Sequence, residues 1–267
     1  MNQNDVLNEL YDMIQEELIY FYNHIRTYDA ERSIDIIFSD NFYETALEYD
    51  MCDVHKTAVI KNGSELDNLN GTVILAPSKD KVTLVVLSKK TLPKRSVAEV
   101  RGTLIHELTH AHDYYDYAEF LEISDYNELF DSQYYNAFYY WTEFHARRIG
   151  YRRFIECMFE KEWKQLRKHR YELVDGIKAN FLIYTDKGRV YDFMQASGRY
   201  CAFLELCSSY TPNFKEDILK DTVDSRLIDT LVEIYDFLSE NQKFEDFVNN
   251  IATFDGLLEK IDLIVGA

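Results

Sequence analysis

The stretch KRSVAEVRGTLIHELTHAHD (94–113) decides how the rest of the chain is organised. Ser96 is followed three residues later by Glu99, which is the spacing of a capping box. A helix that begins here carries His106 and His110 well inside it, four residues apart and therefore on one face. Two imidazoles placed side by side in this way can occupy two corners of a zinc tetrahedron.

Glu107 completes the motif HExxH and lies beside the first of the two histidines. On a helix its carboxylate is off the line that joins the histidines, but it can reach a water molecule at the metal. In the zinc-protease arrangement this carboxylate takes the proton of the water and passes it to the leaving amine. The motif therefore predicts a Zn²⁺ cofactor held by His106 and His110, with Glu107 as the catalytic base.

A catalytic zinc needs a third protein ligand and one open position. The stretch YYNAFYYWTEFHARRIGYRRF (134–154) has a strong helical pattern and contains Glu143. Ala146 and Gly150 follow on the same helix face, where small residues let a second helix approach closely. We therefore predict Glu143 as the third metal ligand. His145 points to nearly the opposite side, so we expect it in a capping or surface role.

Two carboxylates that follow the motif are alternatives. Asp116 lies six residues after His110, which matches the HExxHxxGxxD spacing of some metzincins, although Asp113 stands where that arrangement needs a glycine turn. Asp113 is better suited to accept a hydrogen bond that orients a ligand histidine. A group that stabilises the transition state should also face the zinc, and Tyr200 in SGRYCAF (197–203) is the candidate.

The sequence on either side of the motif predicts an α+β fold that is predominantly helical. Apolar residues recur every four positions from 5 to 26, which predicts a helix, and 41–49 resembles a short one. Runs rich in β-branched residues predict strands at 33–38, 55–60, 71–76 and 81–87, the last two forming a hairpin. After Pro93 the pattern is nearly continuous helix.

This pattern indicates how the chain is organised. We expect a small antiparallel or mixed sheet packed on the active-site helix, followed by an all-helical C-terminal region. Residues 1–154 would form the catalytic core, and residues 155–267 a helical region packed on it.

Charge and composition limit the partners. The chain has 29 Lys and Arg against 47 Asp and Glu, a formal charge of −18, which disfavours nucleic acid and anionic membranes. No apolar run is long enough to span a bilayer, and MNQNDVLNEL lacks the features of a secretory signal. The four cysteines form no CxxC pair, so we expect reduced thiols in a cytoplasmic protein. The expected partner is a peptide or protein substrate, and the sequence does not determine an oligomeric state.

HELTH followed 33 residues later by EFHARRIG resembles the gluzincin metallopeptidases, which combine HExxH with a downstream glutamate. In layout the chain is similar to the phage- and plasmid-associated ImmA/IrrE type, several members of which cleave regulatory repressors in the cytoplasm. In that family a strand that precedes the active-site helix lines the substrate cleft. The resemblance therefore implies that VTLVVL (82–87) is an edge strand to which an extended peptide adds, although the sequence does not distinguish this from a plain core strand.

These features predict a zinc-dependent metallopeptidase that hydrolyses a peptide bond with zinc-activated water. One alternative is a non-proteolytic interaction or regulatory protein of a mobile element that retains the same scaffold. Glu107 argues against it, because a binding module does not need a catalytic base. Another alternative is a zinc amidohydrolase that acts on a small molecule.

Overall fold

The computed structural model describes residues 3–159, 172, 175–176, 190–207, 219 and 226–265. The chain forms two compact units, Met1–Asp131 and Ser132–Ala267. Its described part is predominantly helical with one small three-stranded mixed sheet, which confirms the expected α+β class. Within this part, no helix has the length and apolar character needed to cross a lipid bilayer. The expected catalytic core, 1–154, is a functional division and stays a prediction.

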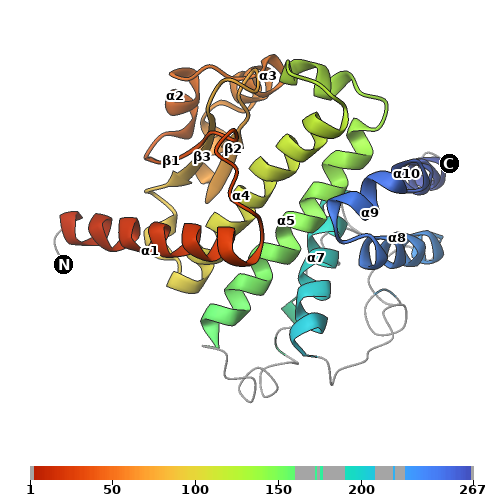
Figure 1. Cartoon of the computed structure of the whole chain (residues 1–267). Coiled ribbons are helices and arrows are strands. Elements are labelled where there is room, and N and C mark those ends of the chain that lie inside the picture. Colours follow the sequence, from red (N-terminus) through yellow and green to blue (C-terminus); the bar gives the residue numbers. More distant parts are fainter. Residues whose placement is uncertain are drawn as a thin grey trace. The chain divides into compact units, whose positions relative to one another are not determined.

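The first unit contains the sheet and the helix that carries HExxH (Figure 1). Its elements in chain order are α1 (Gln3–His24), β1 (Ile34–Ser39), α2 (Phe42–Leu47), α3 (Asp53–Asn62), the 3₁₀ helix η1 (Gly63–Asn68), β2 (Gly71–Ile74), β3 (Thr83–Ser88), η2 (Leu92–Lys94), α4 (Val97–Phe120) and η3 (Tyr126–Asp131). The predicted helices at 5–26 and 41–49 and the predicted strand at 33–38 are confirmed within a few residues.

The sheet has the order β1-β3-β2. β3 pairs in parallel with β1, where Ile34 lies opposite Thr83, and antiparallel with β2, where Gly71 lies opposite Leu87. The antiparallel pair confirms the predicted hairpin. The expectation that VTLVVL is an edge strand was wrong, because β3 is central and its hydrogen-bonding groups are used on both sides. The edges of this sheet are β1 and β2.

The run HKTAVI (55–60) was also predicted wrongly as a strand, since it lies within helix α3. Its β-branched residues favour a strand only where they can pack against neighbours on both faces of a sheet. Among its β-branched residues only Val59 is buried, while Ile60 is exposed. One buried position suits a short helix that packs on the sheet, and this packing overrides the local preference.

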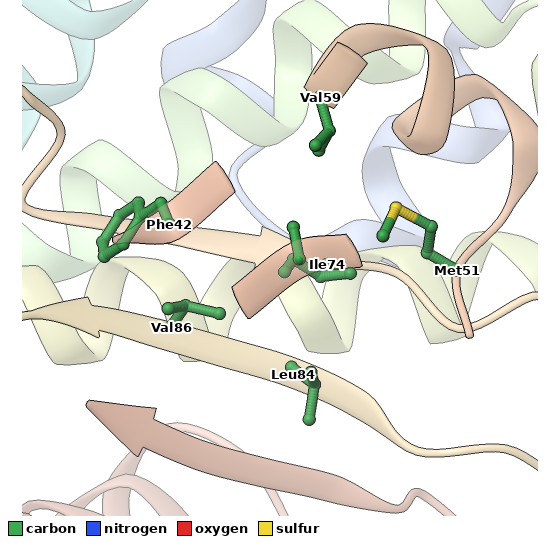
Figure 2. Close-up of a cluster of buried hydrophobic side chains, with 7 residues drawn as sticks. Phe42, Met51, Val59, Ile74, Leu84 and Val86 are labelled. Atoms are coloured by element: carbon green, nitrogen blue, oxygen red, sulfur yellow. The ribbon is translucent and has the colours of Figure 1, made fainter. Parts of the chain in front are cut away.

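An apolar cluster of the first unit lies between the sheet and the helices α2 and α3 (Figure 2). Its buried members are Phe42, Ala46, Met51, Val59, Ile74, Leu84 and Val86. Because side chains alternate between the two faces of a strand, Gly71 and Val73 of β2 point to the opposite face. α4 packs against β2 and β3. The HExxH helix therefore covers the second face of the sheet.

Ion pairs fasten α1 and the loop that follows it to α4. Near the start of α4, Arg101 pairs with Glu16 and with the buried Glu17. Further along α4, Arg26 contacts Asp113 and Asp116, each at 2.7 Å. Because these ion pairs hold α4 at positions before and after the HExxH motif, they limit how far this helix can move relative to α1.

The described part of the second unit consists of helices. They are α5 (Tyr135–Met158), α7 (Val190–Leu206), α8 (Ile228–Glu240), α9 (Phe244–Asn249) and α10 (Ile251–Val265). α5 and α7 approach so closely that a Cβ atom on Gly198 would lie 2.5 Å from the carbonyl oxygen of Phe144. Trp141 of α5 is buried, stacks on Phe247 and donates a hydrogen bond from Nε1 to the carbonyl oxygen of Asn241 at 2.9 Å. These contacts fix the position of α5 within its unit.

Candidate metal centre

The capping box predicted for α4 is present. The Ser96 side chain accepts a hydrogen bond from the Glu99 backbone N–H at 3.3 Å, and the Glu99 carboxylate accepts one from the Ser96 N–H at 2.8 Å. The helix therefore begins at Val97, and HExxH lies in its interior, where the backbone is fully hydrogen-bonded. A rigid backbone at the motif holds its side chains in fixed relative positions.

His106 and His110 are both buried on α4 and converge on one point. Their ring planes are inclined by 85°, and their Nε2 atoms are 3.2 Å apart. Two nitrogens that bind one tetrahedral zinc, with bonds of about 2.0–2.1 Å, lie about 3.3 Å apart. The spacing of the two imidazoles is therefore compatible with two ligands of one metal ion.

Glu143 is the third member of the group. It is buried on α5, and its Oε2 accepts a hydrogen bond from Gln195 of α7 at 3.3 Å. His106, His110 and Glu143 each offer one ligand atom, and these atoms all lie within 4.8 Å of one another. Among the described residues no other group of three histidines, cysteines or carboxylates is arranged in this way. The structure thus brings together the three predicted ligands in an arrangement that could hold a metal ion.

Glu107 is buried beside the two histidines and lies against the first residue of β2. A Cβ atom on Gly71 would be 2.9 Å from Glu107 Cγ and 3.1 Å from Glu107 Oε1. The carboxylate of Glu107 therefore lies at the sheet side of α4. Gly71 was not singled out in the sequence, where a glycine that begins a strand is the only local signal for such a close approach.

Asp113 and Asp116 hold α4 to other parts of the first unit. Asp113 is fully buried and accepts a hydrogen bond from Arg26 at 2.7 Å. Asp116 lies between Arg26 and Arg32, and burial raises its pKa although both guanidinium groups lower it. α4 continues without a turn to Phe120, so the metzincin arrangement of Asp116 is not formed. The proposed orientation of a ligand histidine by Asp113 stays a prediction.

The expectation of a capping or surface role for His145 was wrong. Its side chain is buried and stacks on Trp141, with the ring centroids 4.7 Å apart and the planes inclined by 19°. Trp141 lies one turn earlier on α5, so the imidazole follows the helix face that carries this indole. His145 therefore belongs to the aromatic core of the second unit.

Tyr200, the predicted transition-state stabiliser, is buried on α7, and its ring lies 5.7 Å from that of Tyr235. Tyr200 is five residues after Gln195, which is about 140° around the helix from the residue that faces Glu143. Its role stays a prediction. Tyr139 lies one turn before Glu143 on α5, and burial together with the Glu143 charge raises the pKa of this phenol.

Tyr139 and Gln195 were both missed in the sequence. Tyr139 could have been found from its spacing of four residues from Glu143, which places both on one helix face. Gln195 lies 52 residues from Glu143, and no local pattern marks it. It is therefore a product of the packing of α7 against α5.

No protein-family model, curated protein or solved structure matches this chain.

Proposed function

We propose that this protein is a zinc-dependent metallopeptidase. The observation that supports the proposal is the buried group of His106, His110 and Glu143, whose ligand atoms lie within 4.8 Å of one another. Two imidazole nitrogens and one carboxylate oxygen are a ligand set used by catalytic zinc sites, which leave the fourth position open. Zinc at this group would polarise the scissile carbonyl and lower the pKa of water.

In this mechanism Glu107 is the general base. It follows the first histidine in the chain, and its carboxylate oxygen Oε1 lies close to the backbone of β2. Glu107 would accept the proton of the attacking water and deliver it to the leaving amine. Gln195 would hold one oxygen of Glu143 through the 3.3 Å hydrogen bond and so orient the other oxygen for the metal.

The open edge of β2 favours a peptide over a small amide as substrate. The Ser88 N–H donates a hydrogen bond to the carbonyl of Asn70 at 3.0 Å. Along an antiparallel strand, residues alternate between those hydrogen-bonded to the partner strand and those that are not, so the backbone N–H and C=O groups of Gly71 and Val73 point away from β3. No strand among the described residues pairs with that edge. An extended peptide could add there beside Glu107. The proposal also assigns the protein to the cytoplasm, because its four cysteines form no CxxC pair and reduced thiols persist in that compartment.

Metal analysis tests the ligand set. Purified wild type should carry close to one zinc per chain, and His106→Ala and Glu143→Ala should lose it while staying folded. Asp116→Ala and His145→Ala are matched controls that should keep the metal. Wild type that stays metal-free when zinc is offered after purification without chelator would refute the proposal.

Glu107→Gln tests the mechanism, because the amide keeps the size of the side chain but cannot accept a proton at neutral pH. This variant should retain zinc and lose hydrolysis by about 10²–10⁴-fold, on a peptide that wild type cleaves in a peptide library. Equal rates for Glu107→Gln and wild type would show that Glu107 is not the base. Zinc binding by wild type without any cleavage would instead favour the regulatory alternative.

A further inference from the structure

Residue 71 is the point at which the sheet comes closest to Glu107. A Cβ atom built on Gly71 meets only Glu107 among its three nearest atoms, namely Cγ at 2.9 Å, Oε1 at 3.1 Å and Cδ at 3.2 Å. A separation below 3.0 Å is one that real Cβ atoms do not adopt, so one of the two residues would have to move. The close contact exists because residue 71 has no side chain.

The backbone of Gly71 does not itself require glycine. Its φ angle lies outside the positive range that L side chains avoid, whereas that of Gly63 is +51°. A substitution at position 71 is therefore opposed by space alone. This separates the effect of a side chain on Glu107 from any effect of backbone strain.

Neither the strand nor the helix can easily retreat from the contact. β2 is tied to the buried central strand, with Gly71 opposite Leu87 and the Ser88 N–H donating to Asn70. α4 is held by the pair of Arg101 with Glu17 on one side of the motif and by Arg26 with Asp113 on the other. A side chain at residue 71 would therefore displace the flexible partner, which is the Glu107 carboxylate.

We propose that Gly71 is a positioning residue for the general base. Because residue 71 has no side chain, the Glu107 carboxylate can lie against the start of β2, and the backbone of that strand sets the position of Oε1. The proposal rests on the proposed function, since it assigns Gly71 to the same site. A displacement of about 1 Å in a catalytic group lowers rates by about 10²-fold.

A double-mutant cycle tests the contact without metal or substrate. Gly71→Ala should lower the thermal unfolding midpoint of the metal-free protein by several degrees. In the Glu107→Ala background this loss should disappear, because the three atoms that the new Cβ meets are absent. The neighbouring Thr72→Ala changes the opposite face of β2 and should lower the midpoint equally in both backgrounds. Equal losses from Gly71→Ala in both backgrounds would overturn the proposal.

The visible spectrum of cobalt(II)-loaded protein and the zinc content separate positioning from simple packing. Gly71→Ala should keep the wild-type zinc content, and its cobalt spectrum should change in the same direction as that of Glu107→Gln, whereas Thr72→Ala should leave the spectrum unchanged. On a cleaved peptide, kcat of Gly71→Ala should fall about 10²-fold with a smaller change in KM.

The two proposals fail in different ways. A coupled unfolding loss together with a wild-type cobalt spectrum would show that Gly71 only packs against Glu107, which overturns the positioning role. A wild type that binds no zinc and no cobalt overturns the proposed function, and with it the positioning of a base, although the cycle would still register the contact.

Discussion

Arg26 neutralises a carboxylate that α4 buries completely, so replacing this arginine should strongly destabilise the first unit. Its guanidinium lies 2.7 Å from Asp113, which is 0% exposed, and 2.7 Å from Asp116. In Arg26→Met the alkyl stem remains and the positive charge is lost. Asp116 keeps Arg32 as a partner at 2.5 Å, so most of the effect should come from Asp113.

The size of the effect follows from the burial of the pair. Two unit charges about 4 Å apart attract by about 4 kcal/mol at an effective dielectric constant near 20. Arg26 is 20% exposed and therefore partly solvated, which reduces the loss. We therefore expect Arg26→Met to lower the free energy of unfolding by about 3 kcal/mol, in the range measured for broken buried ion pairs.

The assay must report on the first unit. Both tryptophans lie beyond Asp131, so tryptophan fluorescence reports on the second unit. Urea unfolding of the first unit should therefore be measured by far-UV circular dichroism together with hydrogen exchange of α1 and α4. Chelator excludes metal-linked stabilisation. Lys79→Met is the surface control, because Lys79 pairs with Glu31 where both are more than half exposed, and it should change stability by less than about 1 kcal/mol.

Asp113→Asn completes a cycle with Arg26→Met. The double variant has no buried charge at this position and should be about 2 kcal/mol more stable than the sum of the two single losses predicts. Additive losses in the cycle would refute the reasoning. The same holds for an Arg26→Met variant whose free energy of unfolding lies within about 1 kcal/mol of wild type, instead of about 3 kcal/mol below it.

Three further predictions concern other parts of the structure. Gln195→Leu removes the hydrogen-bond donor to Glu143 and should weaken zinc binding about 10-fold without unfolding the protein, as measured by competition with a chelator. An unchanged zinc affinity would show that this hydrogen bond does not orient the ligand. Gly198→Ala places a Cβ atom 2.5 Å from the carbonyl oxygen of Phe144. After allowing for the better helix propensity of alanine, this clash should lower the free energy of unfolding of the second unit by about 2 kcal/mol, measured by tryptophan fluorescence. Burial lowers the pKa of His55 from 6.5 to about 4, so the unfolded chain takes up the proton at a higher pH than the folded chain. The His55 contribution to the free energy of unfolding should therefore fall by about 3 kcal/mol as the pH drops from 6.5 to 4. In His55→Gln this part of the pH dependence should vanish.

Features encoded by short spacings were predictable. The capping box at Ser96 and Glu99 joins residues three apart, and the convergence of His106 and His110 follows from one turn of helix. The hairpin of β2 and β3 joins runs separated by a short turn. HKTAVI (55–60) shows where local patterns fail, since its β-branched residues favour a strand and the packing of Val59 on the core selects a helix.

The sequence by itself therefore determined the helix that carries HExxH and the two histidines that share one face, and it favoured Glu143 over Asp116 as the third ligand. Only the tertiary structure brought Glu143 to the two histidines, and it paired Asp116 with two arginines instead. It also placed Gly71 against Glu107 and made β2, not β3, the edge of the sheet. The physical reason is range: helix geometry relates residues within a turn or two, whereas contacts across tens of residues depend on how whole elements bury their apolar faces.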